Sequence, residues 1–198
     1  MFGTDDIEKA SNTIKEKGYL IDKHTQGEGV NFKDNQIRKW NNLFLPPELT
    51  RGIFSFLIQH TEGKLPLPKV FKNSSLRKLD HLVVNTNDAD GFVKVYKDVF
   101  GIRLALDKVI EHWKSRMLFF RLNKTTIEVI EKKDDKEPND KLWGLAWEVA
   151  NIKAAHDRLV SEGVDVTPVK EGIKENTLVA TISSHTCNVP TLIIEHLK

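Results

Sequence analysis

The sequence predicts an α+β protein assembled from three copies of one βαβββ unit. Residues 6–18 and 151–163 match in the spacing of their apolar residues and in the glycine that ends each segment. Residues 56–60 (FLIQH) and 192–196 (LIIEH) are also alike, and both are typical of strands. A third segment between these two units repeats the order of one strand, one helix and three strands. Repeats with the same internal order indicate one structural module used several times.

The two matched segments are expected to be amphipathic helices. Asp6 and Asn151 stand at the N-cap, where a side-chain oxygen accepts a hydrogen bond from a free backbone amide. Gly18 and Gly163 supply the left-handed residue that ends many helices. The apolar residues of each helix recur at i, i+3 and i+7 and form one stripe: Ile7, Ala10, Ile14, and Ile152, Ala155, Leu159.

Two further extended runs complete each of these units before its final strand. The runs are expected at residues 19–23 and 36–43 in the first unit, and at 164–169 and 177–182 in the last. Gly27 and Gly29 form an isolated Gly-x-Gly pair, which is expected to be a turn rather than a phosphate-binding loop.

The middle unit shows the same order of elements. Its first strand covers residues 79–84, and a helix follows that begins at Asn87–Asp88 and ends at Gly101. Its remaining strands are expected at residues 102–106, 116–122 and 125–130. The inward face of its helix is formed by Phe92, Val95, Tyr96 and Val99.

We therefore expect units at residues 1–62, 79–131 and 143–198. Residues 63–78, which include Pro66 and Pro68, form a linker. Residues 132–142 form a charged loop, expected to be solvated, with a docking segment as the alternative. The first unit has at most a stub of its opening strand, so the chain is expected to be the C-terminal part of a longer repeat protein.

Composition restricts the class of partner. The 198 residues carry 30 Lys and Arg against 28 Asp and Glu, so no overall field attracts nucleic acid or an anionic membrane. No apolar run approaches the roughly 20 residues of a membrane-spanning helix, and the first residues do not resemble a signal peptide. The chain has one cysteine, Cys187, which excludes an internal disulfide and a cysteine-rich zinc site. A cytoplasmic location is the expectation.

Three phrases of the middle unit carry a resemblance to a known family. Residues 79–84 (LDHLVV), 96–101 (YKDVFG) and 126–131 (TIEVIE) resemble the glyoxalase / bleomycin resistance / extradiol dioxygenase superfamily, also called the vicinal oxygen chelate superfamily. The last unit, with WGLAWEV at 143–149 and VPTLIIE at 189–195, is similar to the second module of its glyoxalase-like branch. The resemblance covers nearly the whole chain outside the linkers.

The resemblance implies a fold and a site. In the superfamily, two modules pair into an open, curved, mixed sheet around a cleft, and metal ligands come from the first and last strands of each module. These positions correspond to His81, Glu128 and Glu195, while Gly144 stands at the fourth position. One imidazole and two carboxylates can hold Fe, Mn, Ni or Zn as divalent ions. A carboxylate, Glu195 or Glu128, could instead act as a catalytic base.

Each candidate also has a structural interpretation. His81 could be a hydrogen-bonded histidine of the strand, and Glu128 a solvated strand residue. Glu195 alternates with apolar residues, so an inward orientation would need a partner. Four residues are candidates for a substrate-binding wall, with core packing or a surface role as the alternative: Trp147, Trp113, Phe119 and Arg121.

Two functions of different classes follow from the resemblance. The first is a metal-dependent lyase, isomerase or dioxygenase that acts on a small molecule with neighbouring oxygens in the cleft between the last two units. The second is a metal-free protein of the bleomycin-resistance kind, which binds a small molecule without chemistry. In both cases the partner is a small molecule rather than nucleic acid or a membrane. The unpaired first unit is expected to pair with its copy in a homodimer, or to pack on the other two units.

Overall fold

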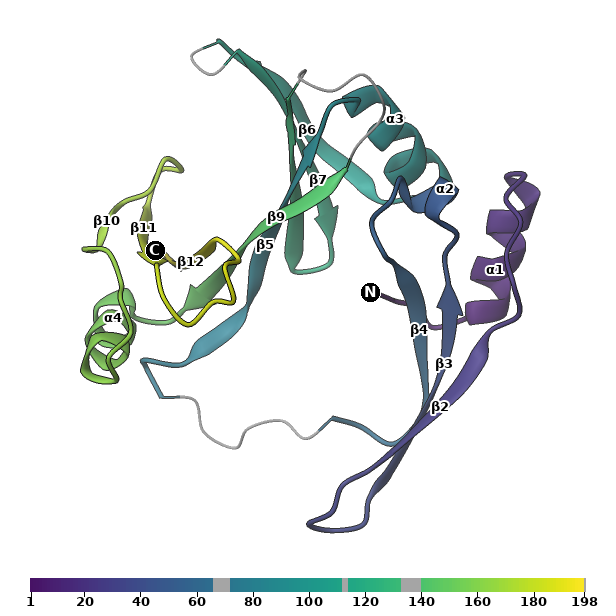
Figure 1. Ribbon diagram of the computed structural model, residues 1–198, viewed down its shortest axis with the longest axis horizontal. Helices are drawn as coiled ribbons and strands as arrows, with labels where there is room; N and C mark the ends of the chain where they lie inside the picture. Colours follow the sequence, from purple (N-terminus) through teal and green to yellow (C-terminus); the bar gives the residue numbers. More distant parts are fainter. Residues whose placement is uncertain (66–71, 112–113, 133–139, 198) are drawn as a thin grey trace.

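The computed structural model describes residues 1–65, 72–111, 114–132 and 140–197 (Figure 1). They form an α+β protein with a four-stranded and an eight-stranded sheet, as expected from the sequence. The elements of the first unit are β1 (Phe2–Gly3), α1 (Ile7–Glu16), β2 (Thr25–Val30), β3 (Ile37–Phe44), α2 (Pro47–Thr50) and β4 (Phe56–Glu62). Those of the middle unit are β5 (Leu76–Thr86), α3 (Ala89–Val93), the π-helical turn η1 (Lys94–Val99), β6 (Arg103–Ile110), β7 (Ser115–Leu122) and β8 (Thr125–Glu131). The last unit holds β9 (Lys141–Val149), α4 (Ile152–Ser161), β10 (Lys170–Glu171), β11 (Thr177–Ile182) and β12 (Thr191–His196).

Strand order confirms that the three units share one topology. The orders are β1-β4-β3-β2, β5-β8-β7-β6 and β9-β12-β11-β10, so each opening strand lies beside the closing strand of its own unit. That pairing is parallel in all three units. The middle and last units join where β5 and β9 pair antiparallel, which produces one continuous eight-stranded sheet. Helices α3 and α4 lie on the outside of its curve, and the inner side is left open (Figure 1).

Two strands depart from the sequence-based expectation. The second strand of the first unit is β2, Thr25–Val30, rather than residues 19–23. Gly27 and Gly29 therefore lie within a strand, not in a turn. A Cβ on Gly27 would lie 2.4 Å from Nε1 of Trp40, and one on Gly29 would lie 3.3 Å from the same indole, so the two glycines make room for the ring. In the last unit the strand is β10 at Lys170–Glu171, after the expected run.

The helix caps confirm the local sequence signals. The side chains of Asp6, Asp88 and Asn151 accept hydrogen bonds from the amides three residues later, at 2.9, 3.0 and 2.8 Å. The glycines that follow the helices, Gly18, Gly101 and Gly163, have φ values of +89°, +66° and +77°. Such left-handed residues end a helix at little cost only when the residue is glycine.

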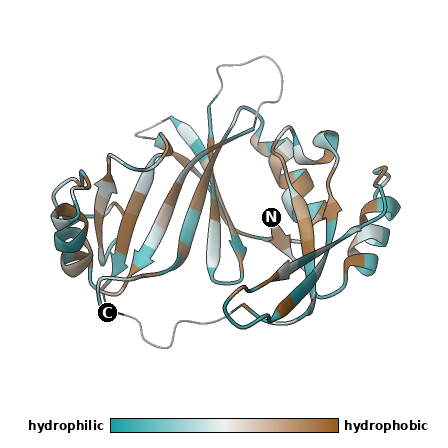
Figure 2. Ribbon diagram, turned by 60° about the horizontal axis from the view of Figure 1, so that its bottom comes forward, coloured by the Kyte–Doolittle hydropathy of each residue, from teal (hydrophilic) through white to brown (hydrophobic). Residues whose placement is uncertain are grey.

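The first unit packs against the middle unit through a shared core. Buried residues of α1, β3 and β4, such as Ile14 and Leu57, belong to the same cluster as Phe92 and Phe120 of the middle unit. The last unit has a smaller core of its own, in which α4 packs on β11 and β12 through Ile152 and Ile193. Hydrophobic and hydrophilic residues alternate along the strands of the large sheet, so its two faces differ in character (Figure 2).

A buried ion-pair network also joins the first unit to the other two. Arg51, which follows α2, donates to Asp140 Oδ2 at 2.6 Å and to Asp88 Oδ2 at 3.0 Å. Asp140 has no exposed side-chain area and also accepts from the Thr86 hydroxyl at 2.6 Å. The network fixes the end of β5, the start of α3 and the approach to β9 against the first unit. Among the described residues, no helix is long and apolar enough to cross a membrane.

Candidate functional site

The inner face of the eight-stranded sheet gathers charged side chains where β5 and β9 meet. Along β5, Leu82 and Val84 point into the helix-covered core, so alternate residues point to the inner face. The β5–β9 register matches Leu79 with Trp147 and His81 with Ala146, which leaves Asp80 as the extra residue of a β-bulge. A bulge places two successive side chains opposite one residue of the partner strand. Both Asp80 and His81 can therefore contribute to one cluster.

Asp80 binds two histidines at once. Its Oδ2 lies 2.9 Å from Nδ1 of His81, and its Oδ1 lies 2.9 Å from Nε2 of His196 on β12. Burial would raise the pKa of Asp80, but the hydrogen bonds and charges of the two histidines outweigh burial and hold the pKa well below its ordinary value. Asp80 is therefore ionised at neutral pH and can only accept. Each imidazole must carry its proton on the nitrogen that faces Asp80, which leaves Nε2 of a neutral His81 without a proton.

Glu128 on β8 lies beside that free nitrogen. Its Oε2 is 3.9 Å from Nε2 of His81, and both side chains are about one-fifth exposed. Burial raises the pKa of Glu128, and the nearby His81 offsets part of that effect. A histidine oriented by a carboxylate and a second carboxyl group with a raised pKa are groups that can exchange protons with a bound molecule.

A second group of ligands lies on the other side of Asp80. Ligand atoms of Asp80, Glu148 and His196 all lie within 4.8 Å of one another. Nε2 of His196 is 3.9 Å from Oε2 of Glu148. The ammonium of Lys78 lies 2.9 Å from Glu148 Oε2 and 3.7 Å from Asp80 Oδ1. A lysine thus already neutralises part of the negative charge of these two carboxylates.

Glu195 does not face His81, contrary to the sequence-based expectation. Its Oε2 accepts a hydrogen bond of 2.7 Å from the amide of Ile152, at the start of α4 on the outer side of the sheet. His196, the next residue, points to the inner face instead, because side chains alternate along a strand.

The other two units use their closing strands in the same way. Oε1 of Glu131 accepts from the amide of Ala89 at 3.2 Å, and Oε1 of Gln59 accepts from the amide of Ile7 at 3.3 Å. In each unit this side chain satisfies one of the unpaired amides at the helix N-terminus. The Gln59 and Glu195 positions of the FLIQH and LIIEH repeat therefore provide a helix cap rather than a metal ligand.

The candidate binding residues divide between the two faces. Phe119 is paired with Glu128 across β7 and β8, so the two side chains share the inner face. Arg121, two residues further along β7, donates to the hydroxyl of Thr126 at 2.9 Å. Trp147 is paired with Ile193, which belongs to the core under α4, so Trp147 lies on the outer face and not in the cleft. Trp113 lies outside the described residues.

Gly144 occupies the position on β9 at which the family resemblance implied a fourth ligand. A Cβ at this position would lie 2.8 Å from the carbonyl oxygen of Pro190, closer than real Cβ contacts. That same carbonyl accepts a hydrogen bond from Leu145, so the backbone that approaches Gly144 is fixed. No ligand side chain fits at this position.

Among the described residues, the set that could hold a divalent cation differs from the expected one. One imidazole and two carboxylates, from Asp80, Glu148 and His196, are donors suited to Mn²⁺, Fe²⁺, Co²⁺ or Zn²⁺. The set differs from the expected His81, Glu128 and Glu195, because Glu195 caps α4. The sequence alone pointed to His81 and Glu128 but not to Asp80, Glu148 or His196. The acidic residue beside His81 and the histidine beside Glu195 were the signals that could have revealed the alternative.

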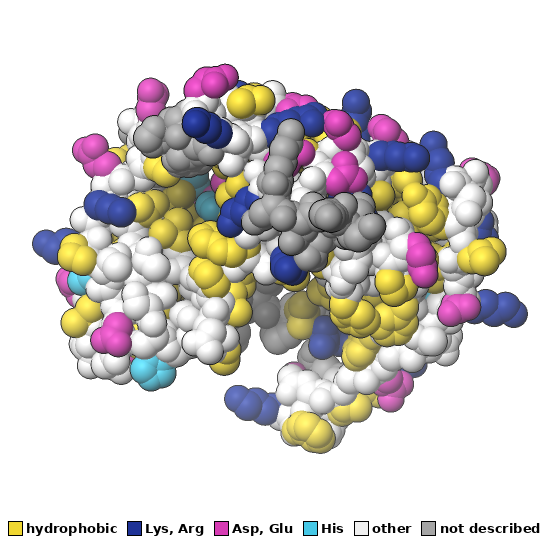
Figure 3. Space-filling model, turned by 45° about the horizontal axis from the view of Figure 1, so that its top comes forward, with side chains coloured by type: hydrophobic (Ala, Val, Ile, Leu, Met, Phe, Trp, Pro, Cys, Tyr) yellow, Lys and Arg dark blue, Asp and Glu magenta, His cyan; other side chains and the backbone are white. Residues whose placement is uncertain are grey.

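The site lies on the inner side of the paired modules. Figure 3 shows the molecule with its top turned forward, and hydrophobic side chains gather around a recess on this face. Two βαβββ modules joined through their opening strands, with ionisable groups on the inner face of the joint sheet, define a protein of the vicinal oxygen chelate class. The sequence profile of the Glyoxalase/Bleomycin resistance protein/Dioxygenase superfamily matches residues 80–181, more than half of the chain. The chain belongs to this superfamily.

Solved structures share the fold of the paired units. The methylmalonyl-CoA epimerase of Mycobacterium tuberculosis is 19% identical, with a TM-score of 0.52, over 66% of this chain and 95% of its own. A Streptomyces coelicolor methylmalonyl-CoA epimerase in complex with 2-nitronate-propionyl-CoA is 17% identical, with a TM-score of 0.50, over 63% and 100%. The hypothetical protein BH1468 of Bacillus halodurans C-125 is 16% identical, with a TM-score of 0.50, over 61% and 95%. No curated protein matches the chain in sequence.

Proposed function

We propose that the chain is an enzyme that transfers a proton on a small molecule bound at the inner face of the eight-stranded sheet. The observation that carries the proposal is the contact of one carboxylate, Asp80, with two imidazoles, that of the adjacent His81 and that of His196, 116 residues further along the chain. Such an arrangement fixes the proton on the Asp80-facing nitrogen of His81 and leaves Nε2 as a base. Glu128, with its raised pKa, stands next to this base and can hold or return the proton.

The substrate class follows from the residues around the base. Phe119 supplies an apolar wall beside Glu128, and Arg121 lies further along the same strand. A substrate with an acidic C–H next to a carbonyl and an anionic group would place the C–H near His81 and the anion toward Arg121. Two of the similar structures are methylmalonyl-CoA epimerases, so 2-substituted acyl-CoA thioesters are the first candidates to test.

A divalent cation would complete this site at Asp80, Glu148 and His196. The cation would supply a Lewis acid that polarises a substrate oxygen. Asp80 would then orient His81 through Oδ2 and contribute Oδ1 to the cation site. Nε2 of His196 would then face the cation instead of Asp80, so the ring proton would have to stand on Nδ1 and the Asp80–His196 hydrogen bond would be given up.

One observation favours a second function, metal-free binding of a small molecule. Nζ of Lys78 is 2.9 Å from Glu148 and 3.7 Å from Asp80, so a fixed ammonium already occupies the neighbourhood that a cation needs. In this alternative the inner face binds an organic molecule with Lys78 as the resident positive charge, and no chemistry follows.

Two measurements separate these functions. Titration calorimetry of chelator-treated protein with Mn²⁺ and Zn²⁺ should show one site that His196→Ala removes and the α4 surface variant His156→Ala retains. NMR in D₂O should show deuterium incorporation at C2 of an acyl-CoA thioester from a panel of 2-substituted esters, lost in His81→Ala and retained in His156→Ala. Saturable ligand binding without cation binding or exchange would support the metal-free function and contradict the enzymatic one.

A further inference from the structure

A cavity lies on the opposite face of β5 from the charged cluster. It has a volume of about 730 Å³, within the range of about 300–1,000 Å³ that is typical of small-molecule pockets. Its floor is the outer face of the large sheet, formed by Leu79, Leu82 and Ile127. Its opposite wall comes from the first unit, at Phe2 and Ile53. The cavity therefore exists only because the first unit packs beside the middle one.

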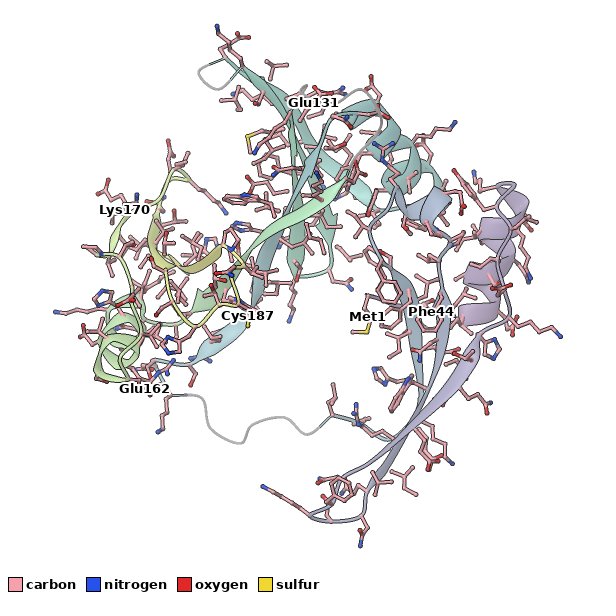
Figure 4. The ribbon with its side chains drawn as sticks, viewed as in Figure 1. Met1, Phe44, Glu131, Glu162, Lys170 and Cys187 are labelled. Carbon is pink, nitrogen blue, oxygen red and sulfur yellow. The ribbon has the colours of Figure 1, made fainter. Side chains whose placement is uncertain are left out.

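The mouth of this cavity exposes large apolar side chains. Phe54 is 76% exposed, Met1 70% and Leu142 62%, and all three line the same opening. Figure 4 shows Met1 on the inner side of the first unit, facing the large sheet. Exposed apolar groups that converge on one concave opening indicate a binding site more often than a solvated surface.

The polar groups of the lining restrict the charge of an occupant. No carboxylate lines the cavity, and Lys124, at the β7–β8 turn, is its one cationic side chain among the described residues. Nζ of Lys78 donates to the carbonyl of Lys124 at 3.1 Å, but it also pairs with Glu148 and Asp80 on the inner face, so its charge serves the inner face and not the cavity. The hydroxyl of Thr125 is already bonded to the carbonyl of Leu79 at 3.0 Å. The lining thus provides apolar walls for an aliphatic group and a positive charge at one end.

We propose that this cavity binds an amphipathic anion, a molecule with an aliphatic body and a single carboxylate or similar acidic end. The aliphatic part lies between Leu82 and Ile53, and the acidic end lies at Lys124. The site does not depend on the proposed enzymatic function, because it lies on the other face of β5 and shares no residue with the cluster of Asp80, Glu148 and His196.

The test compares two amphipathic ligands with alkyl chains of similar length and headgroups of opposite charge. Titration calorimetry of the full chain with dodecanoate should show one saturable site, and dodecyltrimethylammonium should bind about tenfold more weakly or not at all. Lys124→Gln should weaken dodecanoate about tenfold, whereas Lys108→Gln on exposed β6 should not change it.

Substitutions in the apolar lining provide a second test of the proposed site. Leu142→Glu places a carboxylate at the mouth and should abolish dodecanoate binding, while Leu106→Glu, on an exposed part of β6, serves as its control. His196→Ala should leave dodecanoate affinity unchanged, which distinguishes this site from the inner face. The proposal is wrong if dodecanoate and dodecyltrimethylammonium bind equally well, or if the two leucine variants have equal effects. It is also wrong if the protein sediments as a dimer that Leu142→Glu dissociates.

Discussion

Oδ1 of Asp80 lies 2.9 Å from Nε2 of His196, although the two residues come from the opening strand of one unit and the closing strand of the next. Their contact depends on the β5 bulge and on the β9–β12 pairing. It makes the site a property of the paired units rather than of either unit alone.

Asp80→Asn should therefore reduce both stability and order at the site. Asn keeps one acceptor oxygen but turns an amide NH₂ toward the second imidazole, so one of two charge-assisted hydrogen bonds is lost. At pH 7 we expect a loss of about 1–3 kcal/mol in the free energy of unfolding, measured by urea denaturation. Asp165→Asn, at an exposed position, serves as the control.

The pH dependence of this loss has a defined sign. Because the folded-state pKa of Asp80 is depressed, its stabilising effect is complete above the unfolded-state pKa of about 4 and disappears as pH falls toward the folded-state pKa. The difference between wild type and Asp80→Asn should shrink below about pH 4. A difference that stays constant down to pH 2 would contradict the assigned hydrogen bonds.

Glu128→Gln should have the opposite effect on stability. Burial raises the folded-state pKa of Glu128, so its contribution is fully present below the unfolded-state pKa and is lost as pH rises through the folded-state pKa. At pH 8 the variant should be more stable than wild type in urea, and the two should converge near pH 4. The same substitution at exposed Glu175 should not change the unfolding midpoint. Despite its gain in stability, Glu128→Gln should lose proton exchange if Glu128 takes part in the reaction.

Local signals in the sequence predicted the repeat and much of the fold. The caps at Asp6, Asp88 and Asn151 depend on bonds to residues three positions away, so the sequence pattern contains them. The order of strands and helices along the chain also followed from the pattern. The strand at Thr25–Val30 was missed because two glycines within it resemble a turn, and only the position of Trp40 on the neighbouring strand explains them.

The site was predicted less well because side-chain direction depends on tertiary structure. A shift of one residue along a strand exchanges its faces, so Glu195 was chosen where His196 was needed. Asp80 was missed for the same reason, since a bulge is not visible in an alternating pattern. The absence of a ligand at Gly144 was anticipated, but its cause, the carbonyl of Pro190, is a contact between distant segments.

Glu195→Ala should separate the role of Glu195 from that of His196. Removal of the carboxylate leaves the amide of Ile152 without its partner, and we expect a loss of about 1–2 kcal/mol in the free energy of unfolding. Glu195→Gln should retain most of the stability, because Gln59 makes the same bond in the first unit. Neither variant should change cation binding. A loss of cation binding in Glu195→Gln at unchanged stability would restore Glu195 as a ligand.

Gly144→Ala should destabilise the protein through overpacking. The added methyl group would meet the Pro190 carbonyl at 2.8 Å, and relief requires β9 or the turn before β12 to move. We expect a cost of about 1–3 kcal/mol by thermal or urea unfolding. Gly3→Ala is the matched control, because nothing lies within 4 Å of a Cβ at that glycine. Gly144→His should cost still more and should not create a further cation ligand.

Arg51→Met should show how strongly the first unit is bound to the others. The substitution leaves Asp140 buried, with no exposed side-chain area, and without its ion-pair partner. Removal of one member of a buried ion pair typically costs about 3–5 kcal/mol, so we expect a large fall in the urea midpoint, whereas Arg103→Met on exposed β6 should have little effect. The double variant Arg51→Met/Asp140→Asn should recover much of the loss, since the buried charge is then removed. Urea unfolding of the single variant, followed by far-ultraviolet circular dichroism, separates two explanations. Two unfolding steps, of which a chain of residues 72–198 lacks the first, would show that the network is the main attachment of the first unit to the sheet. One cooperative step would assign that role to the shared apolar core.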